Sequence, residues 1–138
     1  MRISLFILFC WCTLVLAQEK AGTIRVAKET VSGLYIYKAN SGSNTYLRIF
    51  KDSSVMIANN SEDAEYMFYW FDRMSRDSNL PKGKAYIRDS IFQVRIKVAQ
   101  SIEDDILLDG IFIETDKLKV HRVGRNVDSK YYVFTKVN

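Results

Sequence analysis

The side chains that could carry out chemistry are few and scattered along the chain. His121 is the only histidine, and it shares a strand face with Lys117 and Lys119, opposite Leu118 and Val120. That face is the solvated one, so we interpret His121 as a surface residue and not as the base of a Ser-His-Asp triad. A single histidine also cannot build a histidine-rich metal site. We therefore predict no catalytic residue and no metal ligand.

Acidic residues form two groups, Glu62-Asp63 and Glu103-Asp104-Asp105. A glycosidase needs two carboxylates that face each other across a cleft. Here the first group opens a predicted helix, and the second lies in a polar turn without the alternating oxygen ligands of a calcium loop. The sequence has no glycine-rich phosphate-binding loop. We expect a protein that is not an enzyme and that needs no cofactor.

Two arginines occupy strand positions where an arginine needs a partner. Arg122 shares a face with Val120, so alternation points it inward, and Arg48 lies between Tyr46 and Phe50 on one face. A buried arginine is costly unless it is paired or stacked. We interpret both as clamps stacked on aromatic rings or as rim residues, with an anionic ligand as the alternative. The candidate ligand-binding residues are Tyr35, Arg48, Trp70, Tyr86 and Arg122.

The N-terminal segment differs in composition from the rest of the chain. Arg2 precedes an apolar run from Ile3 to Leu16, and Val15 and Ala17 fit the −3 and −1 positions of a small-residue cleavage site. The run is shorter than the roughly 20 apolar residues of a membrane-spanning helix. We predict that residues 1–17 form a cleaved secretory signal peptide, with an uncleaved anchor or a buried helix as the alternative.

Both cysteines, Cys10 and Cys12, lie within this predicted signal peptide. A cysteine-free mature chain would have no disulfide, no thiolate nucleophile and no cysteine-ligated zinc. Export without cysteines is compatible with a secreted or a periplasmic protein. No second apolar span follows, so we expect no transmembrane anchor in the mature chain.

The charge of the chain argues against one class of partner. The formal net charge of the 138 residues is +4, and basic and acidic residues are interspersed without a basic stripe. Nucleic-acid binding normally needs a concentrated basic surface. We expect no nucleic-acid partner. The length predicts one domain.

Runs of aromatic and β-branched residues, separated by turn residues, predict strands. The predicted strands cover residues 33–38, 45–51, 55–58, 84–88, 91–98, 106–114, 118–123 and 131–137. Gly110 lies in the middle of one of them, where glycine often marks a bulge or a sharp bend. Residues 18–32 are predicted to be a flexible lead-in, with an optional short strand at Thr23–Ala27.

Residues 62–76 break the strand pattern. Apolar residues recur there at helical spacing: Ala64, Met67, Phe68, Phe71 and Met74. Ser61 can cap the N-terminus of this segment, and acidic residues fill its first turn. The pattern predicts one short amphipathic helix at about residues 62–76.

About eight strands with short connections predict an all-β antiparallel meander over residues 33–138. Such a meander stacks as a sandwich or closes as a barrel, and closure removes both exposed edges. We therefore predict an eight-stranded barrel with one helix packed on it. A barrel of this size is just wide enough to be filled by side chains or to hold one small ligand.

Several short motifs follow one another in a characteristic order. They are Tyr46-Leu47-Arg48-Ile49-Phe50 with Asp52-Ser53-Ser54-Val55, Trp70-Phe71, Lys82-Gly83-Lys84-Ala85-Tyr86, Gly110-Ile111-Phe112, Leu118-Lys119-Val120 and residues 132–137. This order resembles that of small exported bacterial proteins with a lipocalin-like β-barrel, most of them uncharacterised. Ser53 stands where that group usually has glycine, and Gly33-Leu34-Tyr35 replaces the Gly-x-Trp of lipocalins proper. The resemblance implies the fold and brings no catalytic residues.

Two functions fit these observations. The leading hypothesis is an exported, non-enzymatic barrel that binds a small apolar or amphipathic ligand. The alternative is an extracellular or envelope protein that binds a protein partner, or has a structural role, through surface loops such as residues 40–44. The barrel interior separates them, because a cavity of about 300 Å³ or more would favour a carrier and a solid core a surface-acting protein.

Overall fold

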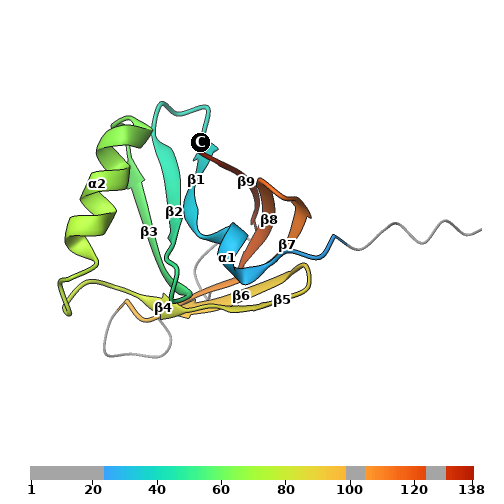
Figure 1. The fold of residues 1–138 in the computed structure, drawn as a ribbon. Coiled ribbons are helices and arrows are strands. Elements are labelled where there is room, and N and C mark those ends of the chain that lie inside the picture. Colours follow the sequence, from blue (N-terminus) through green and yellow to red (C-terminus); the bar gives the residue numbers. More distant parts are fainter. Residues whose placement is uncertain (1–23, 99–104, 124–129) are drawn as a thin grey trace, which may run out of the picture.

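The computed structural model describes residues 24–98, 105–123 and 130–138 as a barrel with two helices (Figure 1). The helices are α1 (Lys28–Val31) and α2 (Ala64–Met74). The strands are β1 (Gly33–Lys38), β2 (Asn44–Ile49), β3 (Ser54–Asn60), β4 (Gly83–Lys84), β5 (Tyr86–Arg88), β6 (Ile91–Ile96), β7 (Ile106–Glu114), β8 (Lys117–Val123) and β9 (Lys130–Lys136). The predicted signal peptide, residues 1–17, lies outside the described residues.

The strands pair antiparallel with their neighbours and close into a ring. β9 pairs with β1, and β4 pairs with both β3 and β6. β4 and β5 keep one register against β6 and are interrupted only at Ala85, so they act as a single broken strand. The predicted eight-stranded antiparallel meander barrel is therefore confirmed.

The barrel interior is the first of two hydrophobic cores. Along β6 the buried residues Phe92, Val94 and Ile96 alternate with exposed ones, as the sequence pattern predicted. The same alternation on the other strands fills the interior with large apolar side chains. These include Tyr35, Leu47, Ile49, Val55, Leu108, Phe112, Leu118, Val120 and Phe134.

The second core lies outside the barrel, where α2 covers the outer face of β1, β2 and β3 (Figure 1). Met67 and Phe71 of α2 are fully buried there against Leu34, Tyr46 and Met56. The predicted helix is present and slightly shorter than residues 62–76. Its N-cap is not the expected Ser61 but Asp63, whose carboxylate accepts a hydrogen bond from the Tyr66 backbone N–H. The central residues of β1–β3 are thus buried on both faces of the sheet.

The segment before β1 corrects one expectation. Residues 24–27 form no strand, and Val26 and Val31 of the expected lead-in pack on the barrel core. Val31 of α1 is only 1% exposed, and the Val26 backbone N–H donates to the Asp89 carbonyl oxygen at 3.0 Å. Contact of these valines with the core places the segment against the barrel, because it outweighs the weak local propensity for a strand.

Gly110 also differs from expectation. It pairs in regular register with Phe92 and Val120, while the register shift in β7 lies between Phe112 and Glu114. A Cβ atom at Gly110 would lie 2.7 Å from the Lys119 carbonyl oxygen. Glycine is therefore needed here for close approach of β8 and not for a bulge.

No helix within the described part of the chain has the length and apolar character needed to cross a membrane.

Candidate functional site

The cavity found inside the barrel is small. It has a volume of about 40 Å³ and is lined by Thr45, Ile57, Asn59, Leu108, Arg122, Tyr132 and Phe134. Such a space holds a few water molecules at most, whereas pockets for small ligands measure roughly 300–1,000 Å³. By the criterion set from the sequence, this packed interior favours a protein that acts through its outer surface over a carrier with a ligand inside the barrel. Arg122 borders this cavity from the inner face of β8, in line with its predicted inward direction.

The candidate residues predicted from the sequence are not brought together in one place. Tyr35 is fully buried in the barrel core, and its hydroxyl donates to the Val31 carbonyl oxygen at 2.8 Å. Burial, with Asp116 as a smaller cause, raises the pKa of the Tyr35 phenol well above its usual range. Tyr86 is 52% exposed on β5. Trp70 lies on α2, with its ring centroid 5.1 Å from that of Phe71. Arg48 contacts the same helix through Asp72, so these two of the five candidates lie near α2.

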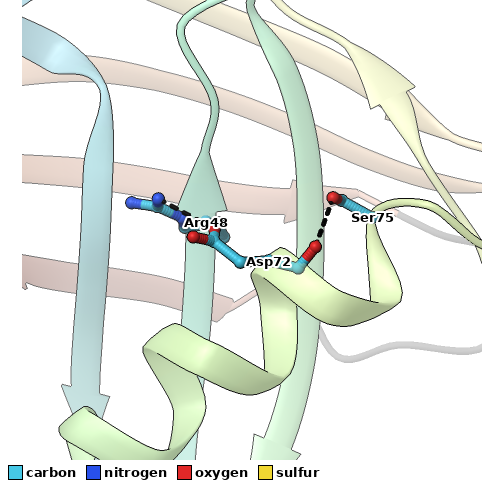
Figure 2. A network of polar contacts seen from close by, with 3 residues as sticks. All are labelled: Arg48, Asp72 and Ser75. Atoms are coloured by element: carbon cyan, nitrogen blue, oxygen red, sulfur yellow. Dashed lines mark hydrogen bonds and ion pairs between the residues drawn. The ribbon is translucent and has the colours of Figure 1, made fainter.

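Arg48 is the best-defined of these residues. Its guanidinium carbon lies 4.3 Å from the centroid of the Phe68 ring and 5.1 Å from that of Phe50. Its Nη2 atom lies 3.1 Å from Oδ1 of Asp72 on α2 (Figure 2). The Arg48 side chain is 12% exposed and points to the outer face of β2, where it is stacked as interpreted from the sequence.

The end of α2 fixes Asp72 opposite Arg48. The hydroxyl of Ser75 donates to the backbone carbonyl oxygen of Asp72 at 2.8 Å (Figure 2). Lys82 in turn donates from Nζ to the Ser75 carbonyl oxygen. Because both carbonyls at the helix end have a side-chain donor, the last turn of α2 is held in place. The Asp72 side chain remains 47% exposed and free to exchange with water.

An open groove of about 650 Å³ lies beside this pair. It is lined by Ser32, Gly33, Arg48, Ile49, Phe50, Lys51, Asp52, Ser54, Phe68 and Ser75. A second groove of about 400 Å³ borders the other side of Phe68, between α2 and the end of the chain at Val137 and Asn138. Sequence reasoning assigned Phe68 to the buried stripe of α2 and missed its role as a groove wall. At the edge of that stripe the side chain is 39% exposed.

Two buried polar atoms on the β2–β3 hairpin have no hydrogen-bond partner among the described residues. They are Nε of Arg48 and Oγ of Ser53. Leaving a buried donor without a partner costs about 1–3 kcal/mol. A buried polar atom without a hydrogen-bond partner in a native structure indicates strain or a partner molecule that is absent from the structure.

The other groups considered from the sequence lie apart from this groove. His121 stacks on Tyr131 with 4.6 Å between ring centroids. Asp105 is nearly buried with Oδ2 4.0 Å from Nε of Arg95, while residues 103 and 104 lie outside the described part of the chain. Within that part, no three or more His, Cys, Asp or Glu side chains gather as metal ligands would.

Comparison of the chain with protein-family models, curated proteins and solved structures found no match. The function proposed below is supported by the residues and the geometry of this chain.

Proposed function

We propose that this protein is a non-enzymatic binding protein that holds a small apolar or amphipathic ligand in the groove beside α2, outside the barrel. The supporting observation is the contrast between the groove of about 650 Å³ and the interior cavity of about 40 Å³. The groove falls within the volume range of small-ligand sites, as the second groove of about 400 Å³ also does, and the interior cavity does not.

The composition of the groove also supports ligand binding. Phe50 and Phe68 supply apolar rings, while Arg48 and Lys51 supply charge. Apolar walls with a few placed polar groups are typical of small-molecule sites. A ligand can reach the groove from solvent without any opening of the barrel.

A neutral fluorescent probe, N-phenyl-1-naphthylamine, tests this proposal. We expect saturable fluorescence enhancement that Phe68→Ala weakens at least about tenfold, because the ring forms a wall of the groove. Tyr131→Ala removes an exposed aromatic ring from β9 and is the matched control, with unchanged binding. Absence of saturable binding, or equal binding by both variants, would contradict the proposal.

We also propose that the chain is exported and acts in a secreted or periplasmic setting. The supporting observation is the sequence of residues 1–17, with its basic start, apolar run and small-residue cleavage site. N-terminal sequencing of the protein purified from its native host should give a chain that begins at Gln18. A chain that retains Met1 in the membrane fraction would contradict this proposal.

A protein partner is the second candidate, and one surface favours it. On the outer face of β7 and β9, the side chains of Ile111, Ile113, Tyr131 and Val133 are all exposed. Ile111 and Val133 flank Lys119 in register, so they lie on one continuous surface. We expect a purified extracellular partner to bind the wild-type chain and not an Ile111→Lys/Val133→Lys variant. Equal binding to both chains would rule out this surface.

A further inference from the structure

We propose that the groove beside α2 recognises the carboxylate of an amphipathic small molecule, with Arg48 as the binding residue and Asp72 as its internal competitor. This inference rests on the proposed function and adds the chemical class of the ligand. It is carried by the hydrogen bonds, the stacking and the charges around Arg48.

The hydrogen bonds of Arg48 leave donors unused. A guanidinium group has five N–H donors, and Asp72 is reached through a single contact between Nη2 and Oδ1 at 3.1 Å. Nε is buried and has no partner among the described residues. Figure 2 shows a guanidinium nitrogen on the side away from Asp72. Arginine binds carboxylates most strongly through two parallel N–H bonds, so the pair with Asp72 is weaker than the group allows.

Stacking holds the guanidinium ready for a ligand. The rings of Phe68 and Phe50 lie 4.3 and 5.1 Å from its central carbon, and the side chain is 12% exposed. A side chain that is already ordered loses little rotamer freedom on binding. The same two rings line the groove, so a ligand whose carboxylate meets Arg48 has apolar surface beside it for its tail.

The charges of the groove favour an anion. Lys51 adds a second cation to the lining, and Asp52 is already held by the Ser54 backbone N–H at 2.9 Å and by Nζ of Lys84 at 3.4 Å. The carboxylate of Asp72 is itself the group bound to Arg48, which shows that a carboxylate fits this position. When a ligand displaces Asp72 from Arg48, water can hydrate the freed Asp72 carboxylate at low cost, because this side chain is 47% exposed.

The test compares octanoate with 1-octanol, which has the same chain length and no charge. Each is titrated into the full mature chain while backbone amides and the Arg48 Nε–Hε signal are followed by ¹H–¹⁵N NMR. We expect octanoate to shift both the Nε–Hε signal and the amides of Gly33 and Phe50. We expect 1-octanol to shift the amides alone, with about tenfold or more weaker affinity.

Two substitutions change the affinity in opposite directions. Arg48→Met should weaken octanoate binding about ten- to hundredfold and leave 1-octanol binding unchanged. Asp72→Asn should tighten octanoate binding several-fold, because the competing carboxylate is gone. Arg73→Met removes an exposed arginine from the same helix and is the matched control, with no effect.

The outcomes separate this inference from the proposed function. Groove amides that shift equally with octanoate and 1-octanol would overturn carboxylate recognition and leave the groove as an apolar site. No groove shift with either compound would overturn both. If Arg48→Met does not fold, as judged by circular dichroism, the Nε–Hε shift and the Asp72→Asn affinity decide the question, and an unchanged affinity in Asp72→Asn overturns the inference.

Discussion

The hydroxyl oxygen of Tyr35 lies 2.8 Å from the carbonyl oxygen of Val31, and this hydrogen bond ties α1 to the inner face of β1. The bond holds α1, which precedes β1 in the chain, against the barrel core. Because both residues are buried, the bond is shielded from water, and its loss leaves the carbonyl without a donor.

Tyr35→Phe should therefore lower the free energy of unfolding at neutral pH by about 1–3 kcal/mol. The apolar ring is kept, so the effect isolates the hydroxyl. Urea unfolding followed by circular dichroism measures it. Tyr131→Phe removes a hydroxyl from a ring that is 61% exposed and should change the free energy of unfolding by less than about 0.5 kcal/mol. Equal effects of the two substitutions would contradict the assigned role of Tyr35.

The same residue predicts a dependence of stability on alkaline pH. Burial, aided by Asp116, raises the pKa of the Tyr35 phenol in the folded protein. The unfolded chain then loses its proton first, at the ordinary tyrosine pKa of about 10. The stabilisation is complete below that pH and declines as pH rises above it. The unfolding free energy of the wild type should fall more steeply above about pH 10 than that of Tyr35→Phe, and parallel curves would contradict this.

Ser53→Gly should stabilise the protein by about 1 kcal/mol. Ser53 has a φ of +66° in the tight turn between β2 and β3, a conformation that costs a side chain roughly 1–2 kcal/mol. Its buried hydroxyl also lacks a partner among the described residues. Glycine removes both penalties and loses a smaller amount through unfolded-state entropy. Thermal unfolding measures the change. Ser53→Ala, which removes only the hydroxyl, should be less stable than Ser53→Gly, and the reverse order would contradict the backbone argument.

Gly83→Ala should destabilise the barrel by about 2–3 kcal/mol or more. A Cβ atom there would lie 2.4 Å from the Arg95 carbonyl oxygen and 2.5 Å from Cγ2 of Val94. Gly83 pairs with Val55 on one side and Ile96 on the other, so the clash occurs where the ring closes. Gly42→Ala is the control, because Gly42 has a positive φ of +81° but no atom within 4 Å of a Cβ. Urea unfolding should show a clearly smaller loss for Gly42→Ala.

Alternation along single strands made much of the fold predictable. In β6 the apolar residues fall on every second position, so the pattern fixes both the strand and its buried face. Helix α1 was missed because its four residues are too few to show a helical period. The closing pairs of Gly83 depend on contact between strands far apart in the sequence, which no local pattern contains.

The candidate site was predictable only in part. Arg48 between Tyr46 and Phe50 on one strand face predicted stacking, since neighbours at i±2 share a face. Phe50 is one of the two rings observed, and the nearer ring, Phe68, comes from α2. Its partner Asp72 lies 24 residues further on, and the rotation of α2 decides that it meets Arg48. Tyr86 was a candidate from its residue type alone, and the alternation of a three-residue strand is too short to predict that it faces solvent.

The packing of α2 in a core separate from the barrel interior has a consequence for its motion. Tyr46, which packs beneath α2, and Leu47, which packs inside the barrel, are adjacent in β2 but belong to different cores. Helix α2 can therefore detach from the outer face of β1–β3 while the backbone hydrogen bonds between these strands stay intact. In native-state hydrogen exchange, the amides of α2 would open together as one cooperative unit, at a lower free energy than those of β2.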